Sequence, residues 1–127
     1  MFEMQFENAS LDPALFNHEA HLRLAWIHIH KYGADKAIHN ITGQLKNYVS
    51  KLGAEDKYNH TLTIAAIKAV RHFYNKTLSN NFQDFILKNP RLKNNFRELM
   101  YAHYSTNIFT ASIAKKEFLQ PDLLPFD

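Results

Sequence analysis

The sequence predicts an all-α protein that folds as a single-domain bundle of five to six helices. Three observations favour this fold. Apolar residues recur at the three- and four-residue spacing of helices along several long segments. No segment alternates apolar and polar residues as a half-buried strand does. The 127 residues include only 3 Gly and 4 Pro, which leaves few turn residues for a many-stranded sheet.

The first long helix is predicted over residues 18–32. Residues 1–11 show no helical period and are expected to form an N-terminal arm. Asp12 followed by Pro13 is typical of a helix start, and Asn17 is the expected N-cap of the long helix. This helix is apolar over most of its circumference, which is typical of a central helix.

A second helix is predicted over residues 34–52, between Gly33 and Gly53. Its apolar residues fall on one face at helical spacing and its polar residues mostly on the other. Because only Gly33 separates it from the first helix, we expect the two helices to pack as an antiparallel pair or a corner.

The second half of the chain predicts several more helical segments. Asn59 is the expected N-cap of a helix over 60–76, and the segments that follow are a short helix over 80–88, a helix over 90–104 and a short helical piece reaching 116. Residues 117–127 are apolar and contain two prolines. We expect this C-terminal tail to pack on the bundle or on a partner.

Composition excludes several classes of protein. The sequence has no Cys, so it has no disulfide and no thiolate metal site. No apolar run approaches the ~20 residues that span a bilayer, and the N-terminus lacks the basic region of a secretory signal. We therefore expect a cytoplasmic protein that does not enter a membrane. The net charge of +3 does not favour nucleic-acid binding.

The 8 histidines are the main chemical feature of the sequence. His18 shares an apolar stripe with Leu22 and Ala25, and His103 lies in the stripe of the helix over 90–104. A buried imidazole needs a hydrogen-bond partner, because an unpaired buried polar group costs ~1–3 kcal/mol. Four other histidines are expected on half-exposed or exposed surfaces: His28, His30, His39 and His72.

A second group of histidines is expected beside His18. His21 lies one turn further along the helix, and His60 joins the pair if the helix over 60–76 begins near it. Such a group could hold a divalent transition metal through neutral imidazoles. The spacing from His18 to His21 is one residue short of the H-E-x-x-H zinc motif, and the two Glu-x-x-His pairs of a di-iron bundle are lacking. The alternative is that the histidines are purely structural.

Three segments resemble an uncharacterised bacterial family of all-helical proteins. They are HEAHLRLAW from His18, KYNHTLT from Lys57 and PDLLP from Pro121. The resemblance implies a small bundle with a cluster of polar side chains, and it implies no activity. The chain departs from the family pattern at Asn59-His60, where a His-Glu pair is expected.

Two functions follow from these observations. The first is the binding of a small molecule or metal in an inner pocket, with the expected ligand-binding residues His18, His21, Trp26, Tyr58, His60, Thr61, Thr63 and His103. The alternative is an interaction module that forms a homodimer through the tail. An enzyme with histidine as general base lacks a visible carboxylate partner.

Overall fold

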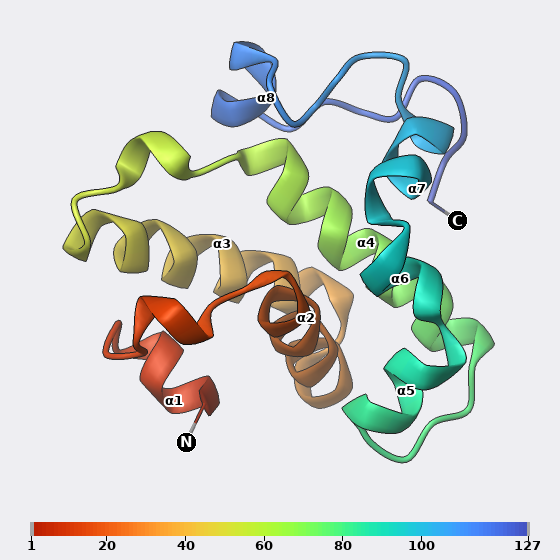
Figure 1. Cartoon of the computed structure of the whole chain (residues 1–127), viewed down its shortest axis with the longest axis horizontal. Helices are drawn as coiled ribbons and strands as arrows, with labels where there is room; N and C mark the ends of the chain where they lie inside the picture. The colour runs from red at the N-terminus through yellow and green to blue at the C-terminus, as the bar shows by residue number, and fades with distance from the viewer. Residues whose placement is uncertain (1, 127) are drawn as a thin grey trace.

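The computed structural model describes residues 2–126, and all the regular structure within them is helical (Figure 1). The all-α fold predicted from the sequence is confirmed. The α-helices are α1 (Phe2–Glu7), α2 (His18–Tyr32), α3 (Ala34–Lys51), α4 (His60–Lys76), α5 (Phe82–Lys88), α6 (Pro90–Asn94), α7 (Phe96–His103) and α8 (Ser112–Lys116). Two 3₁₀ turns, η1 (Pro13–Leu15) and η2 (Glu55–Lys57), precede α2 and α4.

Side-chain caps set the starts of the two central helices. The side chain of Asn17 accepts a hydrogen bond from the Ala20 amide at 2.9 Å, and Asn59 does the same for the Leu62 amide. These bonds satisfy amides that have no partner inside the helix. Gly33 separates α2 from α3 with a φ of 87°, a conformation that glycine adopts more easily than other residues.

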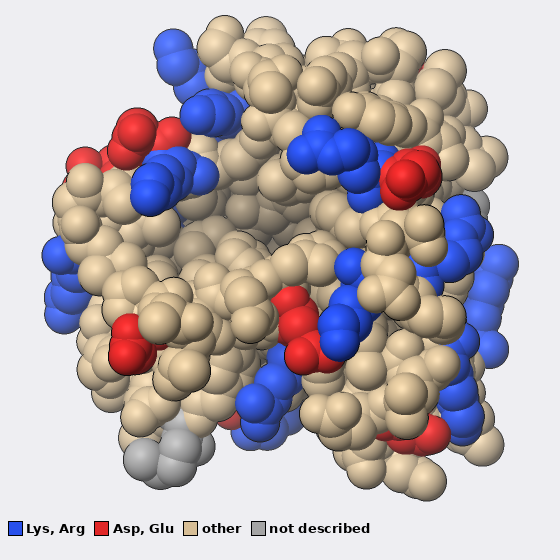
Figure 2. Space-filling model, in the orientation of Figure 1, with Lys and Arg blue, Asp and Glu red and all other residues tan. Residues whose placement is uncertain are grey.

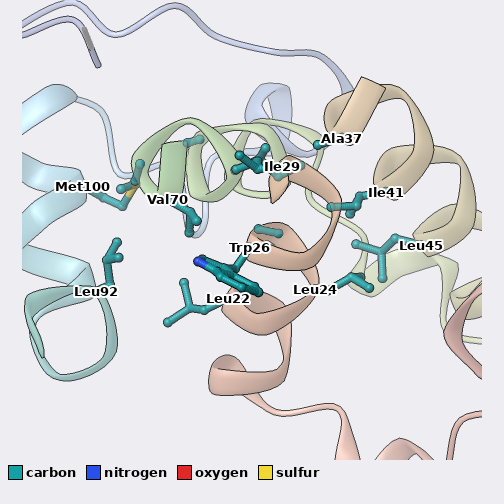
Figure 3. Packing of buried hydrophobic residues seen from close by; sticks show 14 of the residues in the cluster. Leu22, Leu24, Trp26, Ile29, Ala37, Ile41, Leu45, Val70, Leu92 and Met100 are labelled. Atoms are coloured by element: carbon teal, nitrogen blue, oxygen red, sulfur yellow. The ribbon is translucent and has the colours of Figure 1, made fainter. Parts of the chain in front are cut away.

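Helix α2 lies at the centre of the molecule. It packs against α3 and α4, and also contacts α5 and α6. Figure 3 shows Leu22 and Trp26 directed towards Val70 of α4, whereas Leu24 points to the other side, towards Leu45 of α3. These side chains belong to one buried cluster. The nearly all-round apolar character of α2 therefore reflects neighbours on several sides.

Two elements differ from the sequence prediction. The segment expected as an irregular arm contains α1, whose Phe6 is fully buried. A helix of six residues shows too few turns for a period to be recognised. The single helix predicted over 90–104 is divided at Asn95, which leaves the helical conformation with φ −131° and ψ 34°.

The described part of the tail, residues 117–126, packs on the chain's own bundle. The Leu123 amide donates to the His103 carbonyl at 3.0 Å, and the Tyr104 hydroxyl donates to the Leu119 carbonyl at 2.8 Å. Phe126 is buried and stacks on the His103 ring, with centroids 4.1 Å apart. Within the chain, the tail is therefore attached to the end of α7 and to the residues that follow it.

Within the described residues, no helix combines the length and the apolar character needed to cross a bilayer.

Candidate functional site

A cavity of about 520 Å³ lies among the start of α2, the end of α3, the start of α4 and the beginning of α7. In the space-filling view the corresponding face is hollowed between α3 and α4 (Figure 2). The residues that line the cavity are Pro13, Phe16, Asn17, His18, His21, Leu45, Tyr48, Val49, Leu52, Ala54, Lys57, Tyr58, Asn59, Leu62, Thr63, Ala66, Phe96 and Phe109. Most of these side chains are apolar.

The two capping asparagines stand on the cavity wall but have their hydrogen bonds within the protein. Asn17 caps α2, as described above. Asn59 caps α4 and also donates from Nδ2 to the Ile108 carbonyl at 2.7 Å. Their role is therefore to place the first turns of α2 and α4 at the cavity. Those first turns bring His18, His21 and Thr63 onto the wall.

His18 is held at the edge of the cavity by one hydrogen bond. Its Nε2 lies 2.9 Å from the Leu92 carbonyl oxygen, which can only accept, so Nε2 carries the proton and donates. In the neutral ring Nδ1 is then the acceptor. The ring also contacts Phe96, with centroids 4.8 Å apart. The apolar stripe of its helix predicted that His18 is buried, but in the structure His18 is exposed.

His21 is the polar side chain of the wall with the most unusual surroundings. Its ring stacks on Phe16 with centroids 4.0 Å apart, and no residue among 2–126 forms a hydrogen bond with it. Burial, and to a smaller extent the neighbouring His18, lowers the pKa of His21 from 6.5 to about 4. The ring is therefore neutral at pH 7 and has one N–H donor and one nitrogen acceptor without partners.

Tyr58 and Thr63 complete the polar part of the wall. Burial raises the pKa of Tyr58 to about 12, so its hydroxyl stays protonated. This hydroxyl and Nδ1 of His60 form a hydrogen bond of 2.6 Å. Thr63 donates to the Asn59 carbonyl at 2.7 Å. His60 itself does not line the cavity. Its hydrogen bond to Tyr58 makes it a support for that side chain.

The predicted metal centre of His18, His21 and His60 is not formed. No group of three or more His, Cys, Asp or Glu side chains within residues 2–126 is placed to hold a metal ion. Nε2 of His18 is occupied by the Leu92 carbonyl, and Nδ1 of His60 by Tyr58. His60 begins α4 as expected, but its ring is turned to its own helix start and not to α2.

Trp26 belongs to the core and does not line the cavity. It is 7% exposed and stacks on His30, with centroids 4.8 Å apart and planes 7° apart. Its side chain is directed towards Val70 of α4 (Figure 3). Trp26 therefore is not part of the cavity wall, and its contact with a ligand stays a prediction.

Thr61 and His103, also expected as ligand-binding residues, hold the tail. Thr61 is fully buried, donates to the Glu117 carbonyl at 2.7 Å and accepts from the Leu119 amide at 3.0 Å. Nδ1 of His103 donates to the Leu124 carbonyl at 2.7 Å. Both side chains have their hydrogen bonds with the backbone of the tail, which leaves them no role in the cavity.

His28, expected on a half-exposed surface, is buried, and both its ring nitrogens lack a partner. Burial lowers its pKa, and the nearby carboxylates of Glu3 and Glu7 oppose that effect. Both carboxylates belong to α1. The burial of His28 was missed because α1, the helix beside it, was missed as well.

The sequence did not predict which residues form the apolar wall of the cavity. Phe16, Phe96 and Phe109 come from three separate segments, and no spacing in the sequence relates them. Tyr48 was on the predicted apolar face of its helix and is held by a hydrogen bond from its hydroxyl to the Leu11 carbonyl, 2.9 Å long. Lys57 is among the lining residues, whereas no Asp or Glu is.

Comparisons of the chain with family models, curated proteins and solved structures give no match. The resemblance to a helical bacterial family stays a prediction.

Proposed function

We propose that this protein binds a small organic molecule in the cavity between α2, α3 and α4. The apolar body of the ligand lies among the aromatic side chains of the wall, and its polar end meets the ring of His21, beside His18. The observation that carries this proposal is the neutral ring of His21, which lines a cavity of about 520 Å³ without a hydrogen-bond partner. Ligand pockets in proteins typically measure about 300–1,000 Å³.

The ring of His21 is half-buried, and its N–H donor and its nitrogen acceptor have no partner within residues 2–126. The open volume beside the ring also lacks the packing contacts that a filled core makes. A ligand that fills the volume and pairs with His21 supplies the packing contacts and the missing hydrogen bond. The same type of side chain at His103 is paired within the protein.

Binding is proposed in preference to catalysis because of the side chains on the wall. A histidine that acts as a general base is commonly oriented by a carboxylate, and works best with a pKa near the working pH. The lining contains no carboxylate, and the pKa of His21 is about 4. We do not propose a homodimer through the tail, because the buried contacts of residues 117–126 lie within the chain.

A blocking substitution tests the proposal. Ala66 of α4 lines the cavity, so Ala66→Trp fills it, whereas Ala102→Trp places the same side chain on the exposed surface of α7. Fragments of mixed apolar and polar character are screened against the natural protein by ligand-observed NMR. We expect fragments that bind the natural protein and Ala102→Trp but not Ala66→Trp.

Val49→Trp, which blocks the cavity from α3, is the second variant in case Ala66→Trp does not fold. Circular dichroism establishes that each variant is folded. The proposal is wrong if no fragment binds the natural protein, or if the fragments bind the folded blocked variants with unchanged affinity.

A further inference from the structure

We propose that the polar end of the ligand is a carboxylate, and that the ligands of this cavity are small monocarboxylic acids with an apolar aryl or alkyl body. This inference rests on the proposed function, because it names the chemical class that the same cavity takes. It is argued from the charge of the wall, from the helices that begin there and from the donors that remain unpaired.

The wall contains one residue among Lys, Arg, Asp and Glu, and that residue is a cation. Lys57 lines the cavity and is exposed to solvent. Asp and Glu are absent from the lining residues. An anion at the mouth of the cavity is therefore attracted by Lys57 and is not repelled by any carboxylate on the wall. An ammonium group there is repelled by Lys57 and has no carboxylate on the wall to pair with.

Two long helices begin at the cavity. Helix α2 has 15 residues and α4 has 17, and their N-caps, Asn17 and Asn59, both lie on the wall. The start of an α-helix carries a partial positive charge of about half a unit, which favours a nearby anion. Both helix starts therefore act in the same direction as Lys57.

The donors on the wall differ in whether they are already used. Tyr58 is hydrogen-bonded to His60, Thr63 donates to the Asn59 carbonyl and His18 donates from Nε2 to the Leu92 carbonyl. The donor of the neutral His21 ring has no partner among residues 2–126. A carboxylate accepts from such an N–H and from the Lys57 ammonium, and has no donor of its own to leave unpaired.

The rest of the wall determines the other end of the ligand. Phe16, Tyr48, Phe96 and Phe109 contribute aromatic surface, and Leu45 contributes aliphatic surface. A wall of this kind binds an aryl or alkyl group through burial of apolar area. The polar groups are few, which favours a ligand with a single charged group over a sugar or a nucleotide.

The test compares three ligands that share one apolar body: 4-phenylbutanoate, its primary amide and the corresponding amine. A second set is built on decanoate. Affinities for the natural protein are measured by isothermal titration calorimetry at pH 7. We expect the carboxylate to bind about tenfold tighter than the amide, and the amine to bind most weakly, since charge-assisted hydrogen bonds are roughly twice as strong as neutral ones.

Lys57→Gln is the matched variant, with Lys51→Gln as its control, because Lys51 is exposed on α3 and does not line the cavity. Lys57→Gln is expected to weaken carboxylate binding about two- to fivefold and to leave amide binding unchanged, whereas Lys51→Gln changes neither.

The outcomes separate this inference from the proposed function. Equal binding of amide and carboxylate, or tightest binding of the amine, overturns the carboxylate inference and leaves a ligand pocket. An unchanged carboxylate affinity in Lys57→Gln contradicts the role of Lys57. If no compound of either set binds, the carboxylate inference fails, and the fragment screen with Ala66→Trp decides whether the cavity binds anything else.

Discussion

A threonine and a histidine hold the tail, and a threonine and a histidine also line the cavity, but the two pairs differ in their hydrogen-bond partners. The tail pair is Thr61 and His103, and the cavity pair is Thr63 and His21. The tail pair is buried and bonded to backbone groups of residues 117–126. At the cavity, the Thr63 hydroxyl donates to the Asn59 carbonyl of its own helix start, and the ring of His21 has no hydrogen bond within residues 2–126. The comparison teaches that the hydrogen-bond partners, rather than the residue type, distinguish a structural group from a candidate binding group.

The largest effect is expected on the core side of α2. Trp26→Ala removes a side chain that is 7% exposed and packed in the main cluster, so we expect it to lower the free energy of unfolding by about 3–5 kcal/mol. Urea unfolding measures this. A loss below about 1 kcal/mol would show that Trp26 is not part of a packed core.

The next effect separates the two threonines of α4. Thr61→Val leaves the Glu117 carbonyl and the Leu119 amide without their partner inside the protein, and we expect it to cost about 2–3 kcal/mol. Thr63→Val removes the bond to the Asn59 carbonyl at a half-buried position and should cost about 1 kcal/mol or less. Equal losses for the two variants would remove the distinction between the tail and the cavity.

The third effect is a pH dependence caused by His21. Its pKa is lower in the folded protein, about 4, than in the unfolded chain, 6.5, so the unfolded state binds its proton first. The stability that its neutral form contributes is complete above pH 6.5 and is lost as the pH falls towards 4. Between pH 7 and pH 5 the loss is about 2 kcal/mol.

His21→Leu should remove this part of the pH dependence, whereas His39→Leu, at an exposed position, should not. Urea unfolding of the natural protein and both variants at pH 7 and pH 5 provides the comparison. His28 and other groups titrate equally in all three proteins, so their contributions cancel. If His21→Leu and the natural protein lose the same stability, the ring of His21 is not buried as described.

The smallest effect compares two neighbouring alanines of α4. Ala65 is fully buried, so Ala65→Leu overpacks the core and should cost about 1–3 kcal/mol. Ala66 lines the cavity, so Ala66→Leu enters open space and should change stability by less than about 1 kcal/mol, in the stabilising direction. Thermal unfolding measures both, and equal destabilisation by the two would contradict an open cavity.

The long helices could be predicted from the sequence because their ends carry local signals. Asn17, Gly33 and Asn59 act through bonds and backbone angles of their immediate neighbours, and α2 and α4 begin and end where predicted. Helix α1 has six residues and lacks enough turns for a period, so it was missed.

The site could be predicted only in part, because a helical period identifies an apolar face but not the neighbour that covers it. His18, His21, Tyr58 and Thr63 do lie on one cavity wall. Trp26 shares α2 with the two histidines but faces Val70 across the core (Figure 3). Such differences depend on tertiary packing, which the spacing of residues does not contain.

The most direct test of the central claim is nitrogen NMR of the histidine rings during titration with 4-phenylbutanoate. The eight histidines serve as internal controls for one another. If the cavity binds the carboxylate, the ring signals of His21 and His18 shift and saturate, whereas those of His28 and His103 do not move. Saturable binding that leaves His21 unchanged, or that shifts His103 in its place, would contradict the claim.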